Sequence, residues 1–283
     1  MSRMGDVLSG LHASWEFDSD SVLIRYERGI RTPRLLHALT ERRIPLEALR
    51  SVGISPGKRG TVVLRLVPRQ GADPVFDVSA GQLKESCDPY RLVLPESRAT
   101  LAEYYADEIR PGLGGEGECE QLVAAPEPPL HFKAYDAKAS FDGTAVSFRW
   151  FWTGASSAKW KAGDQTFAVT ELEGVEWRSP EGLAGHLRLL PAGGGRTPGA
   201  ADQDPASVVF GLGYGSVQES LPFAAAVLSA IRAAGPARAR AQQVRTDPSD
   251  IADRIRHLGA LHRDGILTDA EFSAKKAELL AEL

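Results

Sequence analysis

Residues 25–50 carry seven arginines, and the arginine side chain matches the oxygens of a phosphate group well. Three of them, Arg28, Arg31 and Arg34, fall in the stretch Arg28-Gly-Ile-Arg-Thr-Pro-Arg34, where Gly and Pro favour a loop. Only three glutamates offset the cations of this segment. The sequence therefore predicts an anion-binding loop; the alternatives are a solvated arginine-rich hairpin and salt bridges to a neighbouring domain.

Other residues whose side chains could act in catalysis or bind a metal do not have the spacing that such sites need. The six histidines are scattered, without an H-x-x-x-H pair, and Gly211-Leu-Gly-Tyr-Gly215 lacks the spacing and the following Lys-Ser/Thr of a phosphate loop. Cys87 and Cys119 lie far apart and outside any C-x-x-C. We therefore predict no catalytic, cofactor or metal site, and a protein that is not an enzyme.

The arginines follow a strand that the chain repeats. Residues 22–26 (VLIRY) are β-branched and apolar, and residues 146–150 (VSFRW) return the pattern at an offset of 146 − 22 = 124. Residues 64–68 (LRLVP) and 187–191 (LRLLP) match at an offset of 123. In both copies strand patterns precede one helical pattern. A register kept over a hundred residues indicates a duplicated domain.

The repeat divides the chain into five segments. We predict a first repeat over residues 1–110, a Gly- and Pro-rich linker over 111–130, a second repeat over 131–234, a second linker over 235–248 and a helical hairpin over 249–283. The loop after the repeated strand has diverged. In the first copy it is basic, and we expect it at the first hairpin of the repeat. In the second copy it carries Phe151, Trp152 and Trp160. Exposed, these residues would form an adhesive apolar patch; the favoured alternative is burial in the core or between the repeats.

The C-terminal segment has the pattern of two amphipathic helices. Thr268-Asp-Ala-Glu271 reads as a capping box, and Asp264-Gly265 as a turn. A unit of this size is too small to bury its apolar faces alone. We therefore expect the segment either to dock on the rest of the chain or to associate with copies of itself through Ile251, Ile255, Leu258, Leu261, Phe272, Leu279 and Leu280.

Charge and hydropathy indicate the partners and the cellular compartment of the protein. The formal net charge is −4, so no nucleic-acid partner is expected. Residues 1–13 lack the apolar core of a signal peptide, and no uncharged run approaches the ~18 residues of a membrane helix. The sequence predicts a cytoplasmic protein.

Two family resemblances emerge from these residues. Gly265-Ile266, Thr268, Glu271-Phe272, Lys275-Lys276 and Leu279-Leu280 resemble the short C-terminal (SHOCT) domain of bacterial proteins. The repeats resemble the tandem DUF4429 units of actinobacterial proteins, through Trp15-x-Phe-Asp18, Ile44-Pro-Leu46 and Leu101-Ala-Glu-Tyr104. Such units are similar to pleckstrin-homology (PH) domains, which implies an α+β fold: two bent antiparallel β-barrels, each with a C-terminal helix, followed by the helical hairpin. For the tail the resemblance implies oligomerisation or tethering.

Two functions are compatible with these observations. The first is a non-enzymatic scaffold or binding protein, a homo-oligomer formed through the tail, with a protein partner that the sequence does not identify. The alternative is binding of an anion or phospholipid headgroup at Arg28, Arg31 and Arg34, with peripheral contact to an anionic membrane.

Overall fold

The computed structural model of the chain describes residues 6–193, 199–245, 256–259, 261–263 and 268–280; for residues 236–245, 270 and 277–280 it describes the backbone alone. The chain divides into two compact units, Met1–Ile231 and Arg232–Leu283. The first unit holds both repeats, and the second holds the C-terminal tail. The fold is α+β, and the described residues form four small antiparallel sheets, none of which closes on itself.

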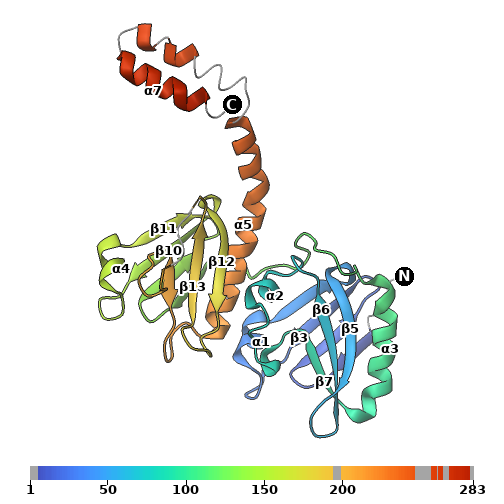
Figure 1. Cartoon of the computed structure of the whole chain (residues 1–283). Coiled ribbons are helices and arrows are strands. Elements are labelled where there is room, and N and C mark those ends of the chain that lie inside the picture. The colour runs from blue at the N-terminus through green and yellow to red at the C-terminus, as the bar shows by residue number, and fades with distance from the viewer. Residues whose placement is uncertain (1–5, 194–198, 246–255, 260, 264–267, 281–283) are drawn as a thin grey trace. The chain divides into compact units, whose positions relative to one another are not determined.

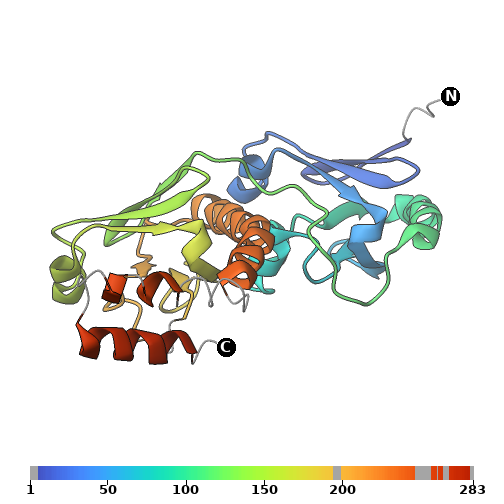
Figure 2. The ribbon, with the colours of Figure 1, turned by 90° about the horizontal axis from the view of Figure 1, so that it is seen from above.

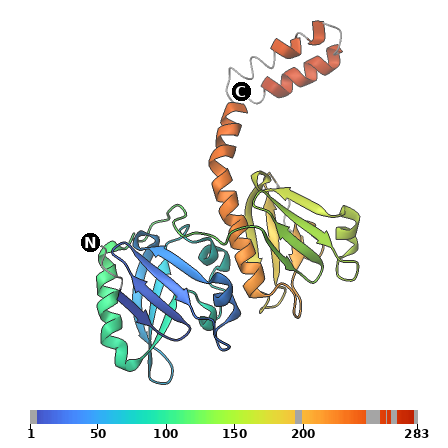
Figure 3. The same ribbon diagram turned by 180° about the vertical axis from the view of Figure 1, so that it is seen from behind.

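The first repeat contains a four-stranded and a three-stranded sheet. The first sheet has the order β1-β2-β3-β4, with strands Asp6–Ser9, Ala13–Phe17, Ser21–Tyr26 and Glu41–Pro45. The second has the order β5-β6-β7, with strands Leu49–Pro56, Thr61–Pro68 and Arg91–Pro95. Helix α1 (Arg34–Leu39) joins β3 to β4, and α2 (Pro74–Ser79) joins β6 to β7. Helix α3 (Ala99–Ile109) closes the repeat, and α2 and α3 lie on opposite sides of its sheets (Figures 1 and 3).

The second repeat builds the same pair of sheets. Its first sheet has the order β11-β10-β9-β8, with strands Gln165–Ala168, Ala145–Trp150, Ala137–Phe141 and Leu130–Lys133. Its second sheet has the order β12-β13-β14, with strands Leu172–Arg178, His186–Pro191 and Ser207–Val209. Helix α4 (Ser157–Ala162) takes the place of α1, and α5 (Val217–Arg245) that of α3. Between β13 and β14 the described residues form no helix like α2.

Strand registers confirm the duplication. Ala13 pairs with Tyr26 in the first repeat, and Ala137 with Trp150 in the second, an offset of 124 on both strands. Leu49 pairs with Pro68 and Leu172 with Pro191, and both ladders shift register at the next residues. A bulge kept at the matched position is a feature of the shared fold rather than a local accident.

The core of each repeat lies between its two sheets and its closing helix. Alternation along β6 points Leu64 and Leu66 inward, and both are buried. The closing helices pack on the first sheet at the same sheet position, because Phe17 stacks on Tyr105 at 4.2 Å and its counterpart Phe141 meets Phe223 edge-on at 6.2 Å. In the view from above, α3 (green) again lies at the end of the repeat away from α2 (Figure 2).

Helix α5 is longer than the sequence predicted. We expected it to end near Ala234, before Gly235-Pro236, but the helix continues to Arg245, so most of the segment expected as a linker is helical. Proline removes one helical hydrogen bond and clashes with the preceding turn. The alanines and arginines around it are strong helix formers, and together they offset this cost.

Five short 3₁₀ helices complete the described structure: Leu46–Ala48, Glu85–Cys87, Glu96–Arg98, Arg110–Gly112 and Val169–Glu171. In the tail, residues 256–259 and 261–263 are helical, and α7 runs over Asp269–Leu280. The predicted capping box is confirmed, since the Glu271 carboxylate accepts hydrogen bonds from the backbone N–H (3.0 Å) and the hydroxyl (2.7 Å) of Thr268. The predicted Asp264-Gly265 turn lies outside the described residues.

Candidate functional site

The arginine-rich loop of the first repeat connects β3 to α1, so its predicted place at the first hairpin is wrong. Two connections precede it, because residues 6–9 form the short strand β1 and residues 13–17 form β2, and neither was predicted as a strand from the sequence. A four-residue strand with one buried side chain gives little periodic signal, so the count of strands before the loop was too low.

The structure separates the seven arginines into paired and unpaired groups. Arg25, Arg43 and Arg50 form exposed ion pairs with Glu16, Asp18 and Glu116, and Arg42 forms a buried one. Arg28, Arg31 and Arg34 are exposed and have no ion-pair partner among the described residues. Their convergence on one anion stays a prediction: Arg34 lines a groove with Leu212 and Tyr214 of the second repeat, and Arg28 and Arg31 do not line it.

An apolar side chain projects from the middle of this loop. Ile30, between Arg28 and Arg31, is fully exposed. The base of the loop is fixed, because Glu27 donates its backbone N–H to the carbonyl of His12 and His12 contacts the Thr32 hydroxyl at 3.2 Å. The loop therefore exposes the apolar side chain of Ile30 between arginines, while hydrogen bonds hold the two ends of the loop in place.

The matching loop of the second repeat is aromatic and exposed, so the expected burial of its tryptophans is wrong. Trp152 is 78% exposed and Trp160 is 48% exposed, and their rings meet edge-on at 5.2 Å. Phe151 is half-buried. Hydrophobic composition favoured burial, but these residues lie beyond the end of β10, where the sheet no longer points alternate side chains into the core.

A buried ion pair holds the base of the aromatic loop. Lys159 Nζ lies 2.6 Å from Asp136 Oδ2, both side chains are buried, and Asp136 Oδ1 also accepts the Val209 N–H at 3.0 Å. Burial raises the pKa of Asp136 and lowers the pKa of Lys159, against their mutual attraction. Asp136 is the counterpart of His12 at an offset of 124, so both loops are anchored at the same place by different chemistry.

Other exposed apolar side chains lie next to this loop. Tyr135 and Tyr214 meet edge-on at 6.3 Å, and Leu212 is fully exposed. The connections fit tightly against one another: a Cβ on Gly154 would lie 2.3 Å from the Tyr135 carbonyl oxygen. Tyr and Trp are the residues that contribute most at protein interfaces, so this end of the second repeat is a candidate docking surface.

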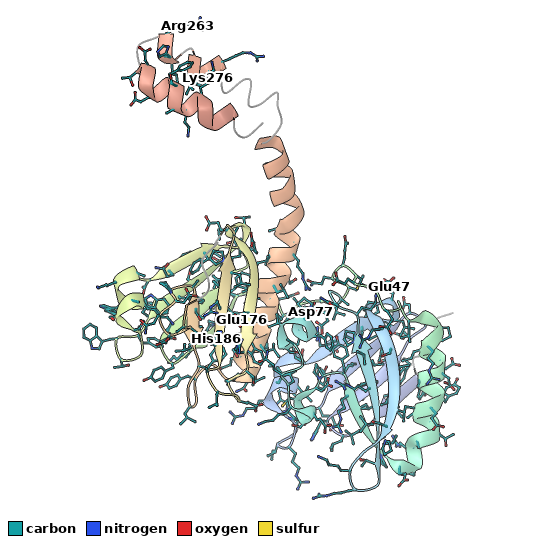
Figure 4. The ribbon with its side chains drawn as sticks, viewed as in Figure 1. Glu47, Asp77, Glu176, His186, Arg263 and Lys276 are labelled. Atoms are coloured by element: carbon teal, nitrogen blue, oxygen red, sulfur yellow. The ribbon has the colours of Figure 1, made fainter. Side chains whose placement is uncertain are left out.

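The two repeats are joined by a side-chain clamp that the sequence did not predict. The amide of Gln82 donates to the Trp177 carbonyl at 3.0 Å and accepts the Ser179 N–H at 3.0 Å. Lys84 adds an exposed ion pair with Glu181 at 2.9 Å. Beside the clamp, a groove of about 640 Å³ lies between α2 and β12. Figure 4 shows Asp77 on one wall, and Glu176 on the other with His186 on the neighbouring strand.

A second network is hidden inside the first repeat. Asp73 receives both Arg42 terminal nitrogens (2.6 and 2.9 Å) and the Tyr90 hydroxyl (2.6 Å), and it caps α2 by accepting the N–H groups of Val75 and Phe76. Both members of the ion pair are buried. Asp73-Pro74 is an N-cap followed by a first-turn proline, which is the sequence signal that could have located α2.

The tail contains part of the predicted association face. Leu258, Leu261 and Phe272 are half-buried; Ile251 and Ile255 lie outside the described residues, as do the side chains of Leu279 and Leu280. His262 joins the two helical segments, because its ring stacks on Phe272 at 4.7 Å and its Nε2 lies 2.6 Å from the Asp269 carboxylate. Figure 4 labels Arg263 on the first of these segments and Lys276 on α7. Their role in oligomerisation stays a prediction.

We searched the described residues for a metal site and for a membrane-spanning helix. They contain no group of three or more His, Cys, Asp or Glu side chains placed to hold a metal ion. Within the same part of the chain, no helix has both the length and the apolar character needed to span a bilayer.

Comparison with known families agrees with the duplicated architecture. The family described as a domain of unknown function, DUF4429, matches residues 15–110 and 139–228. The short C-terminal domain, SHOCT, matches residues 253–280. The search of curated proteins finds no match.

Proposed function

Because the chain belongs to the DUF4429 family and ends in a short C-terminal domain, we propose that it is a non-enzymatic scaffold whose tail brings several copies of the paired repeats together. We further propose that each repeat is PH-like. The order of a four-stranded sheet, a three-stranded sheet and a closing helix, present in both repeats, supports this relation.

The observation that carries the proposal is the partial burial of the tail's apolar residues. Leu258, Leu261 and Phe272 are only half-buried in a unit of residues 232–283. A helical pair of this size gains too little from its own core and is stabilised when the same faces pack against a second copy. Self-association would raise the effective concentration of every surface on the repeats and so strengthen weak contacts through avidity.

Light scattering tests this proposal directly. We expect the full chain to have at least twice the mass of one chain, and a truncated protein of residues 1–246 to be monomeric. Equal, monomeric masses for the two proteins would refute self-association through the tail.

The surface through which the scaffold holds a protein partner is, in this proposal, the aromatic end of the second repeat. Exposed Trp152 and Trp160, with Tyr135 and Tyr214 beside them, form the kind of rigid aromatic cluster that dominates binding energies. The clamp at Gln82 supports a scaffold role as well, because it fixes one repeat against the other and so favours a constant spacing of their surfaces.

A second candidate function is anion or phospholipid-headgroup binding by the arginine loop. Its support is that Arg28, Arg31 and Arg34 are exposed without ion-pair partners among the described residues and flank the exposed Ile30. An apolar tip among cations suits the interface of an anionic membrane.

Flotation with vesicles of anionic lipid tests the second candidate. Changing Arg28, Arg31 and Arg34 to Ala should abolish salt-sensitive binding. The matched control changes Arg25, Arg43 and Arg50 to Ala, which removes the same charge from arginines already paired with acids. Equal losses in the two triple variants would assign binding to net charge and not to the loop.

A further inference from the structure

The first repeat contains a cavity of about 300 Å³ on the outer face of its second sheet, a size within the range of small-molecule sites. It lies between strands β5–β7, helix α2 and the segment that follows α2. Its lining includes the apolar residues Val63 and Val75, the cations Lys58, Arg65 and Arg91, and Ser55 at the surface.

The inner part of the cavity is apolar. Val63 projects from the outer face of β6, opposite to the core residue Leu64, and is nevertheless buried, because α2 and the following segment cover it. Val75 is fully buried, and Phe76 and Leu83 are half-buried. A ligand that fills this part needs an apolar body.

The rim is charged, with cations in excess. Arg65 Nε lies 3.2 Å from Asp88 Oδ2, and Arg91 Nη2 lies 3.9 Å from Glu85 Oε2. Lys58, in the β5–β6 hairpin, has no ion-pair partner among the described residues. Three cations face two carboxylates, so the rim favours a ligand with one negative charge.

The wall of the cavity is fixed before any ligand arrives. Asp73 holds the first turn of α2, and its partners Arg42 and Tyr90 come from β4 and from the residue before β7. Val75 and Phe76, which line the cavity, donate their backbone N–H groups to the same carboxylate. A preorganised wall lowers the entropic cost of binding.

The second repeat carries buried polar side chains at the equivalent positions of its second sheet. At an offset of 123, Val63 becomes His186 and Arg65 becomes Arg188, which is buried and bonded to Glu176 (3.3 Å) and to the Gly199 carbonyl (2.7 Å). The cross-strand neighbour of Arg188 is Glu176, whereas that of Arg65 is Gly53. Arg65 pairs with Asp88 at the rim of the cavity, as Arg188 pairs with Asp204 (3.1 Å), but Arg65 has no second acid opposite it on β5.

We propose that this cavity binds a small amphipathic carboxylate, with its apolar chain against Val63 and Val75 and its carboxylate at Lys58, Arg65 and Arg91. At roughly 30 Å³ per water-sized group, the cavity holds on the order of ten non-hydrogen atoms. A free medium-chain or aromatic acid fits this space, and a two-chain phospholipid exceeds it.

Calorimetric titration of the full chain with decanoate tests the proposal. We expect saturable binding of one decanoate per chain, and at least about tenfold weaker binding of decyltrimethylammonium, which has the same chain and the opposite charge. Lys58→Ala should weaken decanoate binding about tenfold, the size of a lost charged hydrogen bond. Arg59→Ala, a matched loss of charge in the same hairpin outside the cavity, should change affinity less than about twofold.

A variant that blocks the mouth of the cavity and an NMR titration locate the binding site. Ser55 is an exposed residue of the cavity lining, so Ser55→Trp should occlude the mouth and remove binding without disturbing the core. Methyl resonances of Val63 and Val75 should shift on titration of the unchanged protein. The proposal is overturned by absent decanoate binding, by equal affinity for the two amphiphiles, by equal effects of the Lys58 and Arg59 changes, or by shifts confined to other methyl groups.

Discussion

Replacing Asp73 by Asn tests whether one buried carboxylate holds α2 against the first repeat. The substitution keeps the shape of the side chain and an oxygen that can cap the helix, so the cap itself should survive. What it removes is the negative charge that faces Arg42 at 2.6 Å. Burial lowers the pKa of Arg42, but the charge of Asp73 more than reverses this, and the pKa is raised overall. Arginine is not expected to lose its proton in the variant.

The magnitude follows from the burial of the pair. Breaking a buried ion pair by removing one partner costs about 3–5 kcal/mol, because the other charge is left without compensation. The Arg42 and Asp73 side chains are 4% and 0% exposed, so this value needs no reduction for solvent screening. Changing Arg42 to Met in the Asp73→Asn protein removes the stranded charge and should restore about 2 kcal/mol or more.

Hydrogen exchange read by mass spectrometry is the assay, because it measures each repeat separately. We expect peptides over residues 73–80 to lose protection by about 100- to 5,000-fold in Asp73→Asn, the factor that corresponds to about 3–5 kcal/mol, and peptides of the second repeat to keep theirs. A loss of less than about 1 kcal/mol in the first repeat would show that water solvates Arg42 in the variant. The wall of the cavity would then not depend on this ion pair.

Three further outcomes are expected. Gln82→Ala should loosen the clamp between the repeats, seen as faster exchange at the Ser179 amide, because it removes two hydrogen bonds worth about 1 kcal/mol each. Lys84→Ala, which removes only an exposed ion pair, should have little effect. Trp177→Phe should cost about 1 kcal/mol in chemical unfolding, because it removes the indole N–H that bonds Ser220. Burial raises the pKa of Glu176, but the hydrogen bond from Arg178 and the charges of His186 and Arg188 outweigh this and lower it below the ordinary value of 4.5. The ionised Glu176 therefore contributes stability that is present above pH 4.5 and is lost as the pH falls through its lowered pKa. Glu176→Gln should consequently flatten the acid side of a plot of melting temperature against pH. An unchanged slope would contradict this assignment.

The sequence predicted the features that repeat or that depend on neighbouring residues. The strand at residues 22–26 and its copy at 146–150 lie in β3 and β10, and the capping box at Thr268 is present. These patterns arise from strand alternation and from helix ends, which a sequence carries locally. The divergence of the two loops was also visible, since one is basic and the other aromatic.

Contacts between distant residues were not predictable in the same way. Arg42 and Arg43 are adjacent, yet Arg42 is buried and Arg43 is exposed. Strand alternation places Arg42 on the inward face together with Ile44. It does not reveal the partner of Arg42, because Asp73 comes near only in the complete fold. The Gln82 clamp bridges the two repeats, so no pattern within either repeat announces it.

The duplication explains how one fold carries different surfaces. The strand ladders agree in register, while the second sheet is lined by a cavity in the first repeat and by the Glu176–Arg188 pair in the second. The basic loop and the aromatic loop differ in the same manner above matched anchors. The framework can therefore remain constant while the loops and outer faces take on separate binding tasks.

The most direct test of the scaffold is the mass of the full chain in solution with one apolar residue of the tail changed. Phe272→Asp places a charge on the half-buried face of α7, and Ser273→Asp adds the same charge at the exposed neighbouring position. Light scattering over a range of concentrations should give an oligomer for the unchanged protein and for Ser273→Asp, and a monomer for Phe272→Asp. A monomer for all three proteins, or an oligomer that Phe272→Asp leaves intact, would contradict self-association through this face of the tail.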